Sequence, residues 1–211
     1  QTAEIEFEAI VLDYFDGYAV TDQTLFYPEG GGQPSDTGTF VSAESIIRVD
    51  SVQRVGEVIL HHLSGGVVKR GDRIKGMVDE ERRWSLMRHH TATHVLLHAT
   101  KEVLGAHIHQ AGAQKGHESS RIDIRHFKHI TPDELHKIEI AANRMIMAGQ
   151  PVEIGIEDRV KAEQKYGFSL YQGGVPPGRE IRVVKVAGDI EACAGTHCRT
   201  TGEVGAVKII R

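Results

Sequence analysis

The sequence predicts an α+β protein with two domains, a small β-barrel over residues 1–76 and a mixed α+β domain over residues 77–211. Three observations predict this fold class. Short apolar stretches separated by Gly and Asp fill the first domain, a segment without Gly or Pro follows at 84–104, and alternating strand-like segments come after it. With 40% hydrophobic and 26% charged residues, the composition is that of a globular chain rather than a disordered one.

Five short strands are expected in the first domain, because apolar stretches there alternate with turn-forming residues. They lie at residues 5–12, 18–20, 46–49, 58–60 and 74–78. Short strands in such a series are typical of a small barrel. Residues 26–38 interrupt the pattern with three consecutive glycines followed by Gln33, which indicates either a tight turn or a loop with a functional role.

A helix is expected over residues 84–104, and Gly105 is a suitable residue to end it. Two stripes of residues run along this helix on nearly opposite sides. They are the apolar residues Ala92, Leu96, Ala99 and Val103, and the histidines His90, His94 and His98. Because both sides carry specialised residues, we expect the helix to be covered on both.

The remaining chain predicts a second helix and a return to strands. Thr131 and Glu134 form a capping box, Pro132 suits the first helical position, and Gly149 can end that helix. A further short helix is expected at 158–166, and strands are expected at 121–125, 181–186 and 207–210. A loop at 191–198 holds both cysteines.

Composition argues against several classes of protein. The formal net charge is −4, so the chain lacks the overall positive charge of many nucleic-acid binders. No apolar run reaches the about 20 residues of a membrane span, and no basic stretch followed by an apolar core opens the chain, so we expect no signal peptide. The two cysteines, Cys193 and Cys198, are too few and too close together for a disulfide framework, which favours a reducing, cytoplasmic compartment.

Two pairs of residues have the spacing of metal ligands. His90 and His94 are one helical turn apart, so both side chains leave the same face of the expected helix. Cys193 and His197 have the same separation in the C-terminal loop, with small residues between them. Imidazole and thiolate ligands suit tetrahedral Zn²⁺, so we expect a zinc site between the helix and this loop. The nearest competitors as ligands are His89, His98 and Cys198.

Four motifs occur in one chain: GGGQ at 30–33, HTATHVLLHA at 90–99, HIHQAG at 107–112 and CAGTH at 193–197. Together they resemble the editing domain of alanyl-tRNA synthetase and the related freestanding AlaX trans-editing proteins. Residues 171–178 and Cys198 are similar to the archaeal synthetases in particular. The resemblance extends from about Phe7 to the C-terminus. The family's loop often has two glycines, and Ala194 stands at the second position here.

The resemblance implies a zinc-dependent hydrolase that removes wrongly attached serine or glycine from alanine tRNA. The implied zinc ligands are His90, His94, Cys193 and His197. The implied substrate-binding residues are Thr93, Gln110, Gly30, Gly31, Gly32 and Gln33. Thr93 lies beside the metal on the helix surface, where its hydroxyl can contact serine; alternatively, it bonds back to the carbonyl of His89 or His90. Gln110 is expected in a loop after the helix.

The sequence leaves the role of the metal in the reaction open. Four protein ligands fill a tetrahedron, whereas a catalytic zinc usually keeps one position free. The site therefore becomes five-coordinate, or one ligand such as His197 stays loose, or the metal mainly positions the tRNA terminus. We expect zinc to anchor the substrate while a nearby water attacks the ester, with Thr93 and Gln110 as candidate catalytic neighbours and no side chain identified as the general base.

The sequence is consistent with several hypotheses for the function. The chain begins with Gln1 rather than Met, which with the archaeal-type loop favours a domain excised from a synthetase. The remainder of that synthetase, including its ATP-binding part, would then be a partner. The alternatives are a freestanding AlaX-type editor and a non-catalytic, zinc-stabilised tRNA-binding module. An unrelated metallohydrolase is disfavoured, because Thr91 stands where the HExxH motif has glutamate.

Overall fold

The computed structural model describes residues 4–42, 45–172 and 174–210. The chain forms two compact units, Gln1–Leu86 and Met87–Arg211. The boundary between them falls inside a long helix, later in the chain than the expected division at residues 76 and 77. The assignment of separate roles to two domains stays a prediction.

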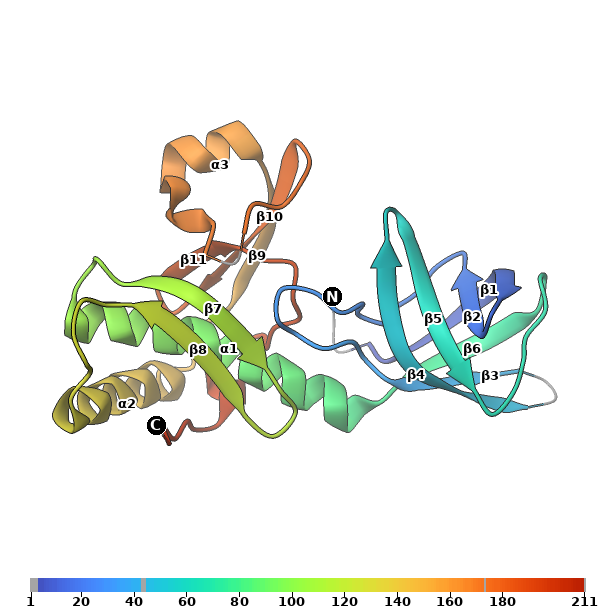
Figure 1. The fold of residues 1–211 in the computed structure, drawn as a ribbon, viewed down its shortest axis with the longest axis horizontal. Coiled ribbons are helices and arrows are strands. Elements are labelled where there is room, and N and C mark those ends of the chain that lie inside the picture. Colours follow the sequence, from blue (N-terminus) through green and yellow to red (C-terminus); the bar gives the residue numbers. More distant parts are fainter. Residues whose placement is uncertain (1–3, 43–44, 173, 211) are drawn as a thin grey trace. The chain divides into compact units, whose positions relative to one another are not determined.

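Six antiparallel strands close into a barrel in the first unit, in the order β1-β2-β5-β4-β3-β6 (Figure 1). The strands are β1 (Glu6–Phe15), β2 (Tyr18–Thr21), β3 (Gly38–Val41), β4 (Ile46–Val55), β5 (Val58–Ser64) and β6 (Arg73–Val78). Fully buried side chains such as Phe40, Ile47 and Val52 fill the interior. The predicted barrel is confirmed, and β3 is the strand that the sequence did not predict.

Glycine has a low propensity for strands, yet strand β3 requires one at its first position. A Cβ atom at Gly38 would collide with the carbonyl oxygen of Met77 on β6. Glycine therefore lets these two backbones approach closely enough to pair. This requirement comes from a neighbouring strand and cannot be read from the local sequence.

The glycine-rich segment forms a tight turn within the first unit. The backbones of Gly30 and Gln33 bond to each other in both directions, at 3.1 and 3.0 Å. Gly31 and Gly32 both have positive φ angles, of 59° and 76°, which explains why glycine occupies these positions. The hydroxyl of Tyr27 also donates to the carbonyl of Gly30. Contact of this turn with an aminoacyl group stays a prediction.

The long helix α1 (Glu80–Leu104) begins earlier than predicted. The carboxylate of Asp79 accepts a hydrogen bond from the backbone N–H of Arg82 at 3.0 Å, which caps the first turn. In the same turn, the buried guanidinium of Arg83 donates to the buried carboxylate of Asp36. This ion pair attaches the start of α1 to the chain that follows the glycine-rich turn.

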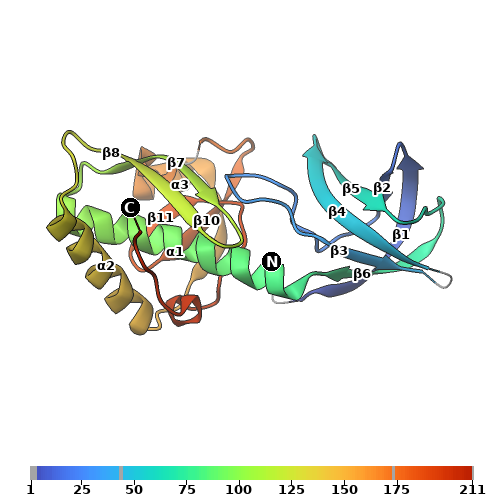
Figure 2. The ribbon, with the colours of Figure 1, turned by 60° about the horizontal axis from the view of Figure 1, so that its bottom comes forward.

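The second unit arranges a hairpin, a three-stranded sheet and further helices around α1 (Figures 1 and 2). The hairpin is formed by β7 (His109–Lys115) and β8 (Ser120–Arg125). The antiparallel sheet has the order β11-β10-β9, with β9 (Glu153–Asp158), β10 (Glu180–Val186) and β11 (Asp189–Ala192). The helices are α2 (Pro132–Met147), α3 (Arg159–Tyr166) and the short η1 (Phe168–Leu170) and η2 (Thr201–Val204).

The predicted features of the two main helices are confirmed. From Thr91 to Thr100 along α1, only Leu96 and His98 are partly exposed, so the helix is covered on both sides. At the start of α2, the side chain of Thr131 accepts from the backbone N–H of Glu134, and the Glu134 carboxylate accepts from that of Thr131.

Two sequence predictions are wrong. Residues 207–210 do not form a strand, because side chains of α2 take their backbone groups: Asn143 bonds both the N–H and the carbonyl of Val207, and Glu139 accepts from Ile209. Gln110 lies in strand β7 and not in a loop. Strands β7, β9 and β11 were missed because they are short or polar, and pairing with a neighbour rather than local pattern stabilises them.

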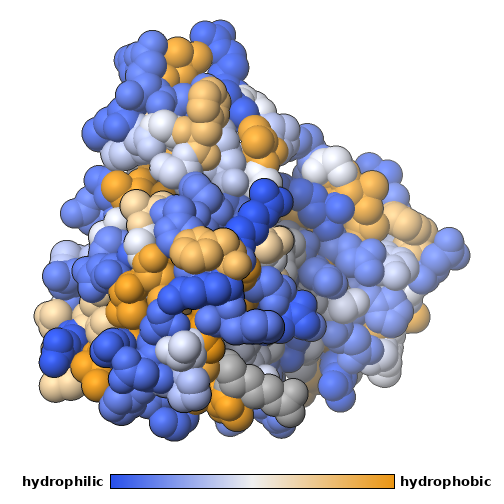
Figure 3. All heavy atoms as spheres, turned by 60° about the vertical axis from the view of Figure 1, so that its left-hand side comes forward, coloured by the Kyte–Doolittle hydropathy of each residue, from blue (hydrophilic) through white to orange (hydrophobic). Residues whose placement is uncertain are grey.

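No helix among the described residues is both long and apolar enough to cross a bilayer. Large apolar side chains are nevertheless exposed on the second unit, among them Phe127, Ile156 and Phe168. On the face drawn in Figure 3, apolar residues are interspersed with hydrophilic ones.

The barrel core contains a histidine that predicts a pH-dependent stability. His61 is fully buried; its Nδ1 lies 3.1 Å from the Ala19 carbonyl and its Nε2 lies 2.9 Å from the Thr24 hydroxyl. Burial lowers the pKa of His61 to about 4. Between pH 6.5 and 4 the unfolded chain therefore binds a proton at this residue that the folded barrel excludes. We expect barrel stability to be lost as the pH falls through this window, by on the order of 3 kcal/mol.

Urea unfolding at several pH values, followed through NMR signals of barrel residues, measures this effect. The variant His61→Gln should unfold more easily at pH 7 and should show a smaller loss of stability on acidification. The matched control His62→Gln changes the partly exposed neighbour on the same strand and should keep the full pH dependence. An unchanged pH profile in His61→Gln would contradict the assignment.

Candidate metal centre

Helix α1 presents two buried imidazoles side by side. His90 and His94 are one turn apart, and their rings stack with centroids 5.4 Å apart and an interplanar angle of 13°. Both residues are almost completely buried, at 2% and 3% exposure. The helical spacing thus places both rings on one face, as predicted.

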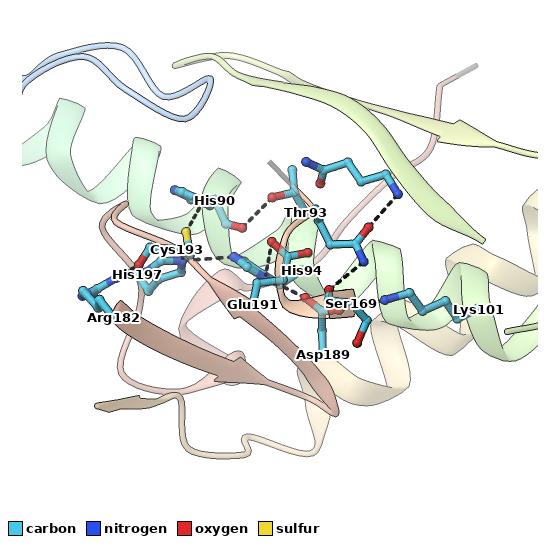
Figure 4. A network of polar contacts seen from close by, with 12 residues as sticks. His90, Thr93, His94, Lys101, Ser169, Arg182, Asp189, Glu191, Cys193 and His197 are labelled. Atoms are coloured by element: carbon cyan, nitrogen blue, oxygen red, sulfur yellow. Dashed lines mark hydrogen bonds and ion pairs between the residues drawn. The ribbon is translucent and has the colours of Figure 1, made fainter. Parts of the chain in front are cut away.

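The loop after β11 brings a thiol and a third imidazole onto these rings (Figure 4). The Sγ atom of Cys193 lies 3.3 Å from Nε2 of His90 and 3.6 Å from Nε2 of His197. Nε2 of His197 lies 3.2 Å from Nε2 of His94. One atom from each of the four residues falls within 4.8 Å of the others. Residues about a hundred positions apart therefore converge, and we call this group the His–Cys cluster.

The distances within the cluster fit a tetrahedral metal ion. Zinc bonds of about 2.0–2.1 Å to nitrogen and about 2.3 Å to sulfur require ligand atoms about 3.3–3.6 Å apart. The separations of 3.2, 3.3 and 3.6 Å between the ligand atoms lie within about 0.1 Å of that range. The cluster can therefore hold a metal ion, whereas the roles of the individual ligands stay predictions. Among the described residues, no group with metal-binding geometry includes His89, His98 or Cys198.

Backbone and side-chain bonds hold the loop in place. The backbone carbonyl of Arg182 in β10 accepts from the backbone N–H of Cys193 at 3.0 Å. The side chain of Arg182 donates from Nη1 to the Cys193 carbonyl at 2.5 Å. On the other side, the hydroxyl of Thr91 accepts from the backbone N–H of Cys198 at 3.0 Å and donates to the carbonyl of Met87 at 2.8 Å. The second cysteine is thus a buried structural residue next to the cluster.

Asp189 orients one of the cluster's imidazoles, and the sequence analysis missed it. Its Oδ2 lies 2.8 Å from Nδ1 of His94, and its Oδ1 accepts from Nζ of Lys101 at 3.1 Å. Burial alone would raise the pKa of Asp189, but these two partners hold it below its usual value. A carboxylate bonded to Nδ1 leaves Nε2 of His94 directed at the cluster.

The electrostatics of the cluster favour a cation at its centre. Burial would lower the pKa of His94, yet the hydrogen bonds to Asp189 and Cys193 raise it well above 6.5. The pKa values of His90 and His197 are lowered well below 6.5, first by burial, so these rings are neutral and keep lone pairs for a metal. Burial would raise the pKa of Cys193, but the hydrogen bond with His94 lowers it, which favours the thiolate.

Two further charged residues near the cluster were not predicted. Glu191 is 7% exposed, and burial raises its pKa to about 7. Its Oε2 lies 3.8 Å from Nδ1 of His94, and its Oε1 has no hydrogen-bond partner among the described residues. Lys115 of β7 is 5% exposed, and burial lowers its pKa despite the charges of Cys193 and Glu191. Asp189 and Glu191 alternate with apolar residues, which places both carboxylates on one face of a strand. This alternation is the sequence pattern from which their shared position could have been predicted.

The residues predicted to bind substrate lie in different elements and make different hydrogen bonds. Thr93 is 4% exposed, and its hydroxyl donates to the carbonyl of His90 at 2.7 Å, which is the back-bonded geometry considered from the sequence. Gln110 is half-buried in β7, and its backbone N–H donates to Oε1 of Gln172 at 2.9 Å. The glycine-rich turn belongs to the other unit. Their roles toward a substrate stay predictions.

Two family models match parts of the chain. Residues 2–82 match the model described as tRNA synthetases class II (A). Residues 181–211 match the threonyl and alanyl tRNA synthetase second additional domain. The second match includes β10, β11 and the loop that carries Cys193 and His197.

Similar proteins agree with these matches over the whole chain. The alanine–tRNA ligase of Methanoregula boonei is 76% identical over 211 residues, which are 100% of this chain and 23% of that protein. The alanine–tRNA ligases of Methanoculleus marisnigri and Methanosarcina barkeri are 72% and 54% identical, over 98% and 100% of this chain. The chain spans 23% of the length of each of these relatives. The resemblance found in the sequence is thereby confirmed, and the chain belongs to the alanyl-tRNA synthetase family.

Proposed function

We propose that this chain hydrolyses the ester that joins serine or glycine to the 3′ end of alanine tRNA, as the editing part of an alanyl-tRNA synthetase. The observation that carries the proposal is the convergence of the His–Cys cluster, in which two distant sequence motifs supply four metal-binding atoms within 4.8 Å of one another. The family of the chain supplies the tRNA as the class of substrate. The remainder of the synthetase is the proposed partner.

The proposed cofactor is Zn²⁺, held by His90, His94, Cys193 and His197. Three imidazoles and a thiolate are ligands that zinc prefers, and the cluster's dimensions suit its bond lengths. A zinc ion in this position would polarise the ester carbonyl or hold the tRNA terminus.

The chain's own residues prepare the site for that ion. Asp189 accepts the Nδ1 proton of His94, which keeps the Nε2 lone pair on the side of the cluster. Lys101 balances the charge of the Asp189 carboxylate, so the carboxylate remains ionised although it is buried.

Thr93 is the proposed residue for recognising serine. Its buried hydroxyl uses its single proton toward the carbonyl of His90, and its oxygen keeps lone pairs that can accept a hydrogen bond. The hydroxyl of a bound serine can donate to that oxygen, whereas alanine cannot. A pocket built around such a bond rejects the analogue that lacks the hydroxyl more strongly than a synthetic site rejects an added one.

For the proposed function, the first prediction concerns metal binding. The purified chain should bind one Zn²⁺, measured by competition with a chromophoric chelator. Cys193→Ser should lose this site, because it removes the thiolate. Asp189→Asn should weaken it by roughly 10- to 100-fold, because the imidazole of His94 loses its orienting carboxylate. Cys198→Ala is the matched control and should bind zinc normally; loss of zinc in this variant alone would refute the ligand assignment.

The second prediction concerns activity. Serine-charged alanine tRNA should release serine in the presence of the protein, whereas alanine-charged tRNA should remain charged. Removal of the metal by a chelator, or Cys193→Ala, should reduce release to the rate without protein, and Cys198→Ala should retain it. Tight tRNA binding without any release of serine would overturn the proposal and favour a non-catalytic binding module.

The third prediction concerns specificity. Thr93→Val removes the hydroxyl at nearly constant volume, so the rate on serine-charged tRNA should fall by about 10- to 100-fold. The matched control is Thr100→Val, because Thr100 makes the same type of bond, to the carbonyl of Leu96, elsewhere on α1. Equal losses in both variants would show that the hydroxyl of Thr93 serves the helix and not the substrate.

A further inference from the structure

One face of the β7–β8 hairpin is turned toward the interior of the second unit. Directly opposite residues of an antiparallel pair point to the same side of the sheet. Three such pairs hold partly or fully buried side chains, whereas their neighbours Gln114 and Arg121 are exposed. The pairs are Gln110 with Ile124, Ala113 with Ile122, and Lys115 with Ser120. We call this side the inner face of the hairpin.

A β-bulge brings Gln110 and Lys115 onto the inner face together. These residues are five positions apart, and in a regular strand such residues point to opposite sides. The register of the hairpin shifts between Gln110 and Gly112, so β7 has one extra residue there, which reverses that relation. Bulges that redirect a side chain in this way are frequent next to active sites. The inner face therefore carries both the predicted substrate residue Gln110 and a lysine without an assigned role.

The tip of the hairpin is held next to the part of α1 that carries His90. The backbone N–H of Gly116 donates to the carbonyl of Ser119 at 2.9 Å, which closes the turn. Within the turn, the backbone of His117 hydrogen-bonds with the imidazole of His89; burial lowers the pKa of His89, and this bond opposes the shift. Figures 1 and 2 show the hairpin alongside α1. The residues that flank the turn therefore have fixed positions beside this part of the helix.

Lys115 flanks the turn and places its ammonium beside the His–Cys cluster. The residue is 5% exposed. Burial lowers its pKa, whereas the charges of Cys193 and Glu191 raise it. In the other direction, Lys115 is among the charges that add to burial in lowering the pKa values of His90 and His197. Because a charge acts strongly on a pKa only over a short distance, these mutual effects indicate that the ammonium lies near the cluster.

Ser120 supplies a second hydrogen-bond donor beside this ammonium. It stands directly opposite Lys115 in the hairpin, so the two side chains are neighbours on the inner face. The hydroxyl oxygen of Ser120 is buried and has no hydrogen-bond partner among the residues that the structure describes. A buried hydroxyl without a partner is unfavourable, and a ligand that accepts its proton removes the penalty. The two residues therefore point to an acceptor that comes from outside the chain.

Two adjacent donors, one of them charged, suit a single oxygen atom that gains negative charge. A phosphate has three strong acceptor oxygens and calls for more donors than these two. The buried setting favours a charge that develops only during a reaction, because fixed donors in a site of low dielectric need no reorganisation when that charge appears. Hydrolysis of an ester creates such a charge on the carbonyl oxygen.

We propose that Lys115, with Ser120 beside it, is a catalytic residue that stabilises the negative oxygen formed on the aminoacyl ester during hydrolysis. The assignment rests on the proposed function, which supplies the ester. The hairpin thus contributes to the reaction itself, in addition to any contact that Gln110 makes with the substrate.

The reaction in which this oxygen appears has two steps. In the first, the oxygen of water forms a bond to the ester carbon and one proton of the water passes to solvent. The electron pair of the C=O double bond moves to the carbonyl oxygen, to which Lys115 and Ser120 donate. In the second, that pair re-forms the C=O bond and the bond to the ribose oxygen breaks. The ribose oxygen keeps the electrons of that bond and takes a proton from solvent.

The kinetics of serine release from charged tRNA by the 211-residue protein test this role. Lys115→Met keeps the length of the side chain and removes its charge, so kcat should fall by about 100- to 1000-fold, as for loss of an oxyanion donor. Ser120→Ala removes a neutral donor and should lower kcat by about 10-fold. KM should stay unchanged in both variants, because the carbonyl of the bound ester is uncharged; this pattern identifies an interaction made only in the transition state.

Two variants serve as matched controls. Gln114→Met changes the exposed neighbour of Lys115 on the outer side of β7, and Lys161→Met removes the charge of an exposed lysine on α3. Both should keep the kcat of the unchanged protein. Lys115→Met itself should bind one Zn²⁺ with unchanged affinity. Loss of zinc in this variant would overturn the proposal, because Lys115 would then serve the thiolate of Cys193 and not the substrate.

Other outcomes would also contradict the role of Lys115. A higher KM with an unchanged kcat in Lys115→Met would indicate a phosphate contact. An unchanged kcat with an unchanged KM would show that the ammonium does not meet the reacting oxygen. If Lys115→Met does not fold, Ser120→Ala decides the question, and an unchanged kcat in that variant overturns the proposal.

A binding experiment separates this inference from the proposed function. Two adenosine analogues are compared, one with serine joined through a planar 3′-amide and one with a tetrahedral phosphonate that carries a negative oxygen at the same position. The unchanged protein should bind the phosphonate more tightly, and Lys115→Met should reduce this preference by about 10-fold or more. An equal preference in both proteins would overturn the inference even if serine is released. If the preference depends on Lys115 but serine is never released from charged tRNA, the anion site stands and the hydrolytic function fails.

Discussion

The second unit depends on the buried hydrogen bond between His94 and Asp189. It joins the middle of α1 to the start of β11, two elements that are far apart along the chain. Because both partners are almost completely buried, either one alone would leave an unsatisfied polar group in the interior. The same bond sets the direction in which the imidazole presents Nε2, and the loop that follows β11 then delivers Cys193 and His197 to that atom.

Negative charge is concentrated around this bond, and the arrangement explains why the site favours a cation. Asp189 and the thiolate of Cys193 both raise the pKa of His94, although burial opposes them. The same negative groups stabilise either a proton on His94 or a metal ion within the cluster, so binding of the proton and binding of the metal compete. Lys101 and Arg182 supply positive charge and hydrogen bonds at the edge of the cluster, where they hold Asp189 and the Cys193 carbonyl without occupying the centre.

The proposed function assigns the chemistry at the ester to the His–Cys cluster, because thiolate and imidazole groups suit a metal ion that acts on an ester. Strand β11 has two differently used faces: Asp189 and Glu191 lie beside His94 of the cluster, whereas Ile190 and Ala192 pack against the apolar cluster that includes Leu170 of η1. The chain spans 23% of the length of its relatives, so the proposals concern this part of the synthetase alone.

Local signals in the sequence determined the features that depend on near neighbours. The helical spacing of His90 and His94 and the capping box at Thr131 are set within one or two turns, and the structure has both. Tertiary structure alone decided that Gln110 lies in a strand, that 207–210 bonds to α2, and that Asp189 meets His94. Each of these outcomes depends on a hydrogen-bond partner from a distant part of the chain. The local sequence pattern does not specify which residue that partner is.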